Sequence, residues 1–140
     1  MKFPLLPVCL LFILTACSKD HDGVIDGAAL PKQSQYLQGS WKSYSYYEGT
    51  GNGGEKIWNL TDGSTRITFG ADSTYTNTSD PAYDHFILRA LGTDTILQVY
   101  AKGQPGRDTG NFFISINTNT LTLGSRLCIE GCGEKYVRLQ

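Results

Sequence analysis

A succession of short, strand-like segments fills the chain from residue 38 onward and limits the folds open to it. These segments are rich in Thr, Tyr, Ile, Val and Phe, and Gly, Asn, Asp and Pro separate them. Apolar runs of this length between turn-forming residues, without a sustained helical period, are typical of β-strands. We expect about eight strands, near residues 39–47, 64–70, 73–78, 84–91, 95–101, 110–117, 120–127 and 134–139, with 55–60 as a further short strand or an ordered loop.

Short connections between these segments predict how the strands are ordered. The turns at 70–73, 92–94 and 117–119 contain residues that adopt turn geometry at little cost. Sequential strands joined by tight turns become antiparallel neighbours. We therefore expect an all-β, antiparallel up-and-down meander that closes into a small barrel and so leaves no open edge. A two-sheet sandwich is the alternative.

Alternating apolar residues indicate strands with one buried face. The side chains expected to share such a face are Phe112, Ile114 and Ile116, then Leu121, Leu123 and Leu127, and Leu97, Val99 and Ala101. The pattern leaves open whether this inward set fills the lumen or lines a cavity.

The N-terminal segment has the features of an export signal. Met1 and Lys2 precede an apolar run over 3–13, which is shorter than the roughly 20 residues of a membrane-spanning helix. Residues 14–17 (LTAC) resemble the bacterial lipobox, which predicts cleavage of 1–16 as a signal peptide and attachment of lipid, including palmitate, to Cys17. An ordinary signal peptide that ends at Ala16 is the alternative.

The residues after Cys17 predict where a lipid-anchored protein would lie. Ser18 stands where an aspartate would retain some lipoproteins at the inner membrane, so we expect the outer membrane. Residues 18–22 (SKDHD) resemble short signals for the cell surface, and the periplasmic side is the alternative. Residues 17–36 lack apolar periodicity and are expected to form a flexible tether, with 37–140 as one domain.

Charge argues against some partners. Without Lys2 the chain has eleven basic and thirteen acidic residues, a net charge of −2. Such a scattered, nearly balanced charge offers no footprint for nucleic acid.

A Gly-x-Trp motif opens the first strand. Residues 37–42 read LQGSWK, and in this position the motif resembles the lipocalin and fatty-acid-binding-protein superfamily. In that superfamily the tryptophan plugs the closed end of the barrel, and an arginine of the last strand stacks across it. The resemblance therefore implies a structural signature of Gly39, Trp41 and Arg138.

More narrowly, the chain is similar to the small lipocalin-like lipoproteins of Gram-negative bacteria. It shares with them the lipobox, the hairpin ITFGADSTY at 67–75 and the ending CIEGCGEKY at 128–136. The resemblance implies a lipocalin-like β-barrel over 37–140.

Cys128 and Cys132 are the thiols left beside the anchor after cleavage. An even pair this close in an extracytoplasmic domain predicts a disulfide. A redox pair and a zinc site are the alternatives. The zinc site would need further ligands, and His85 is the sole histidine of the domain.

A glycine-rich loop at 49–54 is a candidate rim for a ligand. Its GTGNGG sequence lacks the following helix that a dinucleotide site needs. Tyr46, Tyr47 and Trp58 flank it and form the candidate ligand rim, because exposed aromatics beside flexible glycines suit binding. In the alternative interpretation these rings cap the core.

Catalytic chemistry finds little support. Glu48 and Glu55 bracket the glycine loop as an acid–base pair would, but the sequence does not set their separation, and no nucleophile comes with a recognisable partner. We expect no enzyme, cofactor or metal, and non-catalytic binding of a small apolar ligand or cell-surface component. The alternative is an accessory or scaffold lipoprotein that binds another envelope protein through its outer surface.

Overall fold

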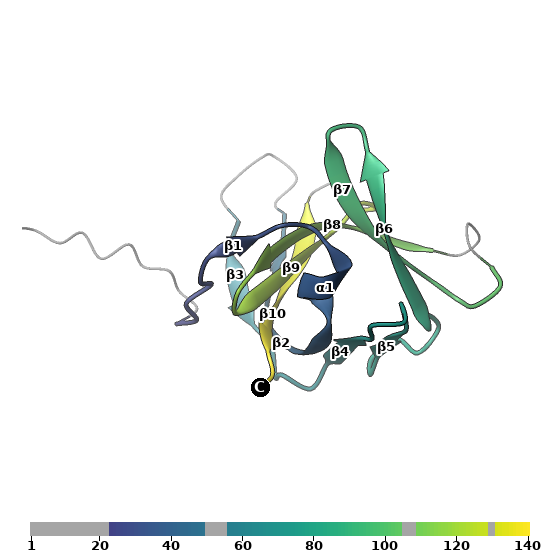
Figure 1. Cartoon of the computed structure of the whole chain (residues 1–140). Coiled ribbons are helices and arrows are strands. Elements are labelled where there is room, and N and C mark those ends of the chain that lie inside the picture. Colours follow the sequence, from purple (N-terminus) through teal and green to yellow (C-terminus); the bar gives the residue numbers. More distant parts are fainter. Residues whose placement is uncertain (1–22, 50–55, 105–108, 129–130) are drawn as a thin grey trace, which may run out of the picture.

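In the computed structural model the described residues are 23–49, 56–104, 109–128 and 131–140. They form β1 (Ala29–Leu30), α1 (Ser34–Leu37), β2 (Gly39–Glu48), β3 (Trp58–Leu60), β4 (Arg66–Phe69), β5 (Tyr75–Asn77), β6 (His85–Leu91), β7 (Asp94–Tyr100), β8 (Gly110–Asn117), β9 (Thr120–Ser125) and β10 (Cys132–Arg138). Eight strands lie in the order β5–β4–β2–β10–β9–β8–β7–β6, and every pair is antiparallel (Figure 1). The predicted antiparallel meander is confirmed.

The two end strands of this order meet and nearly close the barrel. The amide of Tyr75 donates to the carbonyl of Asp84 at 2.8 Å, and the amide of Phe86 donates to the carbonyl of Ser73 at 3.0 Å. An isolated bridge joins Thr74 to His85 between the same strands. These bonds join the start of β5 to the start of β6, so the structure is the predicted barrel and not a sandwich. The β6–β7 hairpin extends beyond the other strands (Figure 1).

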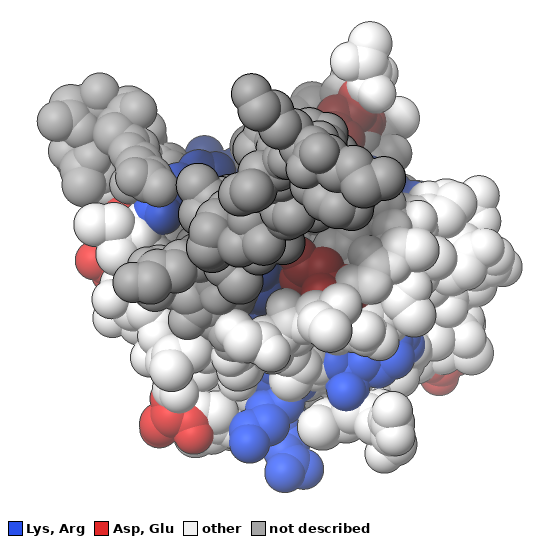
Figure 2. Space-filling model, turned by 90° about the vertical axis from the view of Figure 1, so that its left-hand side faces the viewer, with Lys and Arg blue, Asp and Glu red and all other residues white. Residues whose placement is uncertain are grey.

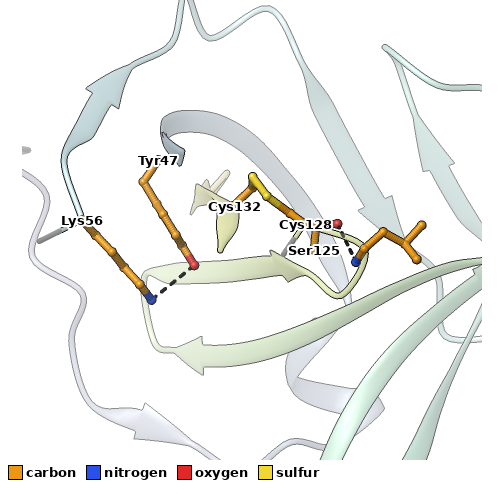
Figure 3. The surroundings of a disulfide bond; sticks show 6 residues. Tyr47, Lys56, Ser125, Cys128 and Cys132 are labelled. Carbon is orange, nitrogen blue, oxygen red and sulfur yellow. Dashed lines mark hydrogen bonds between the residues drawn. A yellow bond between two sulfur atoms is a disulfide. The ribbon is translucent and has the colours of Figure 1, made fainter. Parts of the chain in front are cut away.

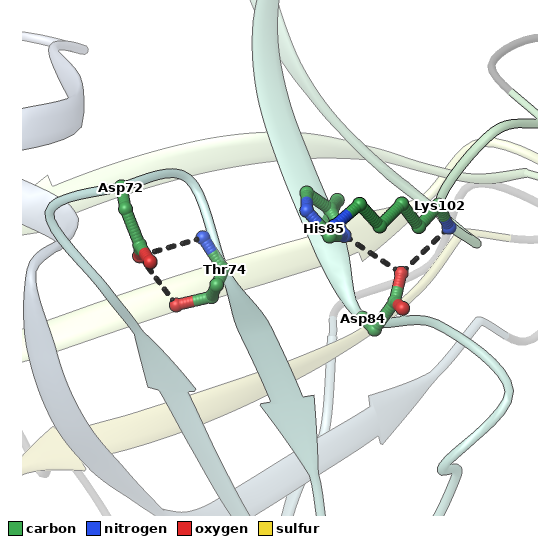
Figure 4. Close-up of polar contacts among 5 residues, drawn as sticks. All are labelled: Asp72, Thr74, Asp84, His85 and Lys102. Atoms are coloured by element: carbon green, nitrogen blue, oxygen red, sulfur yellow. Dashed lines mark hydrogen bonds and ion pairs between the residues drawn. The ribbon is translucent and has the colours of Figure 1, made fainter.

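Two aspartates hold the chain where the barrel closes (Figure 4). Asp72 accepts hydrogen bonds from the hydroxyl and amide of Thr74, at 2.7 and 3.2 Å, and these bonds lower the pKa of its carboxyl. Asp84 accepts from His85 Nδ1 at 2.8 Å and from the Lys102 amide at 2.7 Å. The bond from His85 is the main cause of the lowered pKa of Asp84. Both carboxylates therefore brace backbone next to the seam.

The barrel interior is filled by the inward faces of the strands. Its core cluster consists of Leu37, Trp41, Ile67, Phe69, Tyr75, Phe86, Leu97, Val99, Ile114, Ile116, Leu121, Leu123 and Tyr136. Phe112 packs against this cluster from the side. Two residues of the expected inward set differ: Leu127 is 85% exposed, and Ala101 lies beyond the end of β7. The reason for Leu127 is that β9 ends at Ser125, after which the strand alternation no longer applies.

The segment before β2 corrects the expected tether. The sequence predicted flexible chain over 17–36, of which 17–22 lies outside the described residues. Within the described part, Ala29 pairs with Asn117 and Leu30 pairs with Ile116 at the end of β8. This end of β8 is available because its pairing with β7 stops at Phe113. The single-turn helix α1 follows. A two-residue strand and a four-residue helix are too short to show a period in the sequence.

The segment around residue 58 is a strand rather than a loop over its described part. β3 pairs with β2 through Tyr47 opposite Trp58 and Ser45 opposite Leu60. It lies beside the β2–β4 pairing, which occupies Gly39 to Lys42 of the same strand. β3 therefore pairs with the second half of β2, and β4 pairs with the first half.

Candidate functional site

One end of the barrel is closed by the indole of Trp41. Its ring is completely buried, and its Nε1 donates a hydrogen bond to the carbonyl of Leu37 in α1 at 2.8 Å. The guanidinium carbon of Arg138 lies 4.0 Å from the ring centroid. Arg138 also donates to the carbonyls of Tyr36, at 2.7 Å, and Gln38, at 2.9 Å. Stacking and hydrogen bonding together tie β2, β10 and α1 into a plug.

Gly39 begins β2 beside this plug. Its φ of 112° lies in the region that favours glycine, and a Cβ there would come within 3.5 Å of Arg138 Nη1. A side chain would be strained mainly by the backbone conformation. All three residues of the Gly39, Trp41 and Arg138 signature therefore lie together, in structural positions.

A β-bulge in β2 changes which side chains face the interior. Lys135 pairs with Ser45 and Tyr136 pairs with Ser43, so Tyr44 is the extra residue of β2. Because side chains alternate along a strand, one extra residue exchanges the inward and outward faces beyond it. Tyr46 consequently faces the lumen together with Glu134, while Tyr47 faces outward with Gly133.

The lumen opens into a pocket of about 350 Å³ at the end opposite the plug. Its lining residues are Tyr46, Tyr47, Glu48, Tyr75, Asn77, Phe112, Leu123, Ser125, Cys132, Gly133, Glu134 and Tyr136. They come from β2, β5, β8, β9 and β10. The pocket is thus a barrel mouth with aromatic walls and a few polar side chains, which is the composition of many small-molecule sites.

Two buried tyrosines belong to the pocket wall. Tyr75 and Tyr136 are each 4% exposed. Burial raises the pKa of Tyr75 to about 12. Burial, followed by the negative charge of Glu134, raises the pKa of Tyr136 above its usual value. Both phenols therefore stay protonated at neutral pH, and the Tyr136 hydroxyl donates to Glu134 Oε2.

The polar side of the pocket carries two carboxylates. Glu134 lies opposite Tyr46, and Glu48 lies opposite Cys132, so both belong to the inward face of the β2–β10 pair. The described residues that line the pocket include no Lys, Arg or His. Among the described residues, no group of three or more His, Cys, Asp and Glu side chains is arranged to hold a metal ion. Glu55, the expected partner of Glu48 in an acid–base pair, lies outside the described residues.

A disulfide joins Cys128 to Cys132 at the edge of this mouth (Figure 3). The Cα atoms are 5.6 Å apart, and Cys132 is the first residue of β10. Cys132 lies opposite Ser125 of β9 and Glu48 of β2. The predicted disulfide is confirmed, and it fixes the point at which β10 enters the sheet.

The three residues of the candidate rim lie on two sides of the barrel wall. Tyr46 and Tyr47 both border the pocket, but Tyr46 faces inward with Glu134, whereas the Tyr47 ring points outward and packs with its centroid 4.6 Å from that of Trp58. Lys56 donates to the Tyr47 hydroxyl at 3.4 Å (Figure 3), and the Lys135 ammonium lies 5.0 Å from the Trp58 centroid. Trp58 is not among the residues that line the pocket.

Several pocket residues were not predicted from the sequence. Phe112 appeared only as a member of an inward face, and Tyr75, Glu134 and Tyr136 were not identified as lining a site. A signal existed in β10, where Cys132, Glu134 and Tyr136 alternate on one face. Cys17 and residues 50–54 of the glycine loop lie outside the described residues.

The face in Figure 2 carries scattered basic and acidic side chains, without a large area of one sign among the described residues in view. Within the described chain, none of the helices has the length and apolar character needed to span a bilayer. A comparison of the chain with known protein families, curated proteins and solved structures finds no match.

Proposed function

We propose that this chain is an outer-membrane lipoprotein whose lipocalin-like barrel binds a small, largely apolar molecule without chemical turnover. The observation that carries the proposal is the pocket of about 350 Å³ at the mouth of a barrel whose other end is plugged. Concave sites from about 300 Å³ upward with aromatic walls and a few polar groups suit small ligands. The lipid on Cys17 would hold this barrel at the membrane.

The filled base of the lumen limits the size of the ligand. Trp41, Ile67, Leu97 and Leu121 belong to the core cluster, are completely buried and do not line the pocket. A ligand would therefore occupy the mouth and contact Tyr46, whose side chain is 37% exposed there. A molecule of one or two rings fits this space better than a long acyl chain.

A second candidate function is an accessory lipoprotein that binds another envelope protein. It is favoured by apolar side chains exposed at β3 and next to it: Ile57 is 63% exposed and Leu60 is 64% exposed. Exposed apolar side chains on an outer surface can contribute to a protein interface.

Filling the pocket with a side chain tests the first function. Ser125→Phe adds a ring to the pocket wall, and Ser115→Phe adds the same ring to the exposed outer face of β8. Native mass spectrometry of protein purified from its own cells should show co-purifying small molecules with the wild type and Ser115→Phe, and not with Ser125→Phe. The neutral probe 2-naphthylmethanol should likewise bind the wild type and Ser115→Phe in a titration, and should not bind Ser125→Phe.

Circular dichroism and thermal melting establish that both variants fold before the comparison is made. If wild-type protein carries no small molecule and the neutral probe binds all three proteins equally or not at all, the ligand-binding proposal fails. A protein captured by the wild type and lost on Leu60→Ser would support the second candidate.

A further inference from the structure

We infer that the pocket selects a ligand with a positive charge, namely an amine or quaternary ammonium group attached to an apolar body. This inference rests on the proposed function and names the ligand class for the same pocket. Its basis is the combination of an aromatic cavity with two carboxylates, Glu48 and Glu134, on one wall.

The register of β2 and β10 brings the two carboxylates together. Glu134 pairs with Tyr46 and Glu48 pairs with Cys132, so the glutamates are diagonal neighbours on the inward face. Diagonal neighbours on antiparallel strands lie within reach of long side chains. Neither glutamate forms an ion pair with any other described residue.

Tyr136 holds one of these carboxylates in place. Its hydroxyl donates to Glu134 Oε2, which leaves Oε1 of the same carboxylate for a ligand. This hydrogen bond fixes the position of the Glu134 carboxylate in the pocket wall. The wall therefore presents a fixed negative group at the edge of an apolar space.

Two described lysines beside this wall, Lys56 and Lys135, make their contacts on its outer side. Lys56 contacts Tyr47, and Lys135 lies over Trp58 and pairs with Asp26 at 3.5 Å, all on the outer side of the wall. Alternation places Lys135 outward when Glu134 and Tyr136 face inward. The negative charge inside the mouth is therefore not neutralised by direct contact with these lysines.

The aromatic walls suit the same ligand class. The rings of Tyr46, Tyr75, Phe112 and Tyr136 line the pocket, and the faces of aromatic rings attract cations. Leu123 adds apolar surface for the body of the ligand. An anionic ligand would be repelled by both carboxylates, and a neutral one would shield them from water without a compensating partner.

Three probes with one ring system and different charge test this inference. They are 2-naphthylmethylammonium, 2-naphthylmethanol and 2-naphthoate, measured by isothermal titration calorimetry at pH 7 and low salt. The ammonium should bind about tenfold more tightly than the alcohol, and the carboxylate should bind most weakly. Adding salt should reduce the advantage of the ammonium, because salt screens partly exposed charges.

Single substitutions then identify which carboxylate is responsible for the preference for the ammonium probe. Glu134→Gln keeps a hydrogen-bond acceptor for Tyr136. It should weaken binding of the ammonium about fivefold or more, while changing the affinity for the alcohol less than about twofold. Glu48→Gln, which lies nearer the rim, is expected to act in the same direction and serves if the first variant does not fold. Asp62→Asn removes an exposed carboxylate outside the pocket lining and should change neither affinity.

The outcomes separate this inference from the function on which it rests. If the ammonium, alcohol and carboxylate bind equally well, or if Glu134→Gln and Glu48→Gln leave the preference unchanged, the inference fails and the binding function stands. If no probe binds and Ser125→Phe behaves as the wild type does, both fail.

Discussion

At the scale of single residues, Arg138 makes more contacts than the stacking expected from the sequence. Besides covering the indole of Trp41, it donates to the carbonyls of Tyr36, Gln38 and Thr118. Two of these carbonyls lie at the C-terminal end of α1. A cation there satisfies carbonyl groups that a helix end leaves without a partner. One side chain thus joins the last strand, the helix and the first long strand.

Arg138→Ala is expected to lower the free energy of unfolding by about 2–3 kcal/mol, because it removes a shielded cation–π contact and several hydrogen bonds. Chemical denaturation measures this loss. In a Trp58→Phe background, where Trp41 is the remaining tryptophan, the emission of Trp41 should shift to longer wavelength as water reaches the ring.

Arg66→Ala is the matched control, since Arg66 lies on the exposed face of β4. Its loss should change stability by less than about 0.5 kcal/mol. Unchanged emission in Arg138→Ala, together with a stability equal to that of Arg66→Ala, would contradict the role of Arg138 in the plug.

At the scale of the elements, the bulge at Tyr44 requires small residues on the opposite strands. Because Tyr47 faces outward, its ring lies against Gly133 of β10 and near Gly124 of β9, which pair with each other. A Cβ on Gly133 would lie 2.7 Å from Tyr47 Cε1 and 2.9 Å from the backbone oxygen of Leu123. A Cβ on Gly124 would meet no heavy atom closer than 3.8 Å. The two glycines therefore differ in how much space they have.

Gly133→Ala is expected to destabilise the barrel by about 1–3 kcal/mol, the usual cost of overpacking a close contact. Gly124→Ala should be neutral or slightly stabilising, because a strand glycine is entropically costly and this site has room. Thermal and urea denaturation of the two variants provide the comparison. Equal stability of both variants would mean that Tyr47 does not lie against β10 as described.

At the scale of the whole molecule, the barrel has one closed and one open end. Trp41 and α1 close the end where β2 begins, and the disulfide and the pocket lie at the other. The seam between β5 and β6 is held near Tyr75 and Phe86. β1 pairs with β8 and so holds the described N-terminal part of the chain against the barrel wall.

Cys17→Ser is expected to move the protein from the membrane fraction to the soluble fraction after cell lysis, because serine cannot accept the thioether-linked lipid. The barrel should keep its melting temperature, since the lipid proposed for Cys17 would not contribute to its core. Fractionation followed by immunoblotting checks the location, and mass measurement of the lipid extract checks the acyl chains on Cys17.

The double variant Cys128→Ser/Cys132→Ser is the control. It should stay in the membrane fraction and lose about 2 kcal/mol of stability, as expected for a short closed loop. A Cys17→Ser protein that remains membrane-bound would contradict the anchor.

Local patterns in the chain were sufficient to predict the eight strands of the barrel, their antiparallel order and the disulfide, but not the short strand β1. Period-two alternation and turn residues act over a few positions, as in Phe112 to Ile116 and the turn before Tyr75. The residues that cause a strand or a turn therefore lie within the segment that forms it, and the sequence shows them directly. The disulfide could be predicted for the same reason, because Cys128 and Cys132 are close in the sequence. The resemblance to a known superfamily suggested the stacking of Arg138 on Trp41. It did not suggest the hydrogen bonds that these two residues make with α1.

Tertiary packing decided the pocket and its charge. The side of the wall on which Tyr46 and Tyr47 lie depends on one extra residue, Tyr44, and a one-residue shift in pairing reverses every later side chain. Glu134 meets Tyr46, and Tyr75 faces the same mouth, only because the ring of strands brings distant segments together. Alternation tells which residues share a face, whereas the closure of the barrel and the bulge determine which of those faces surrounds a ligand.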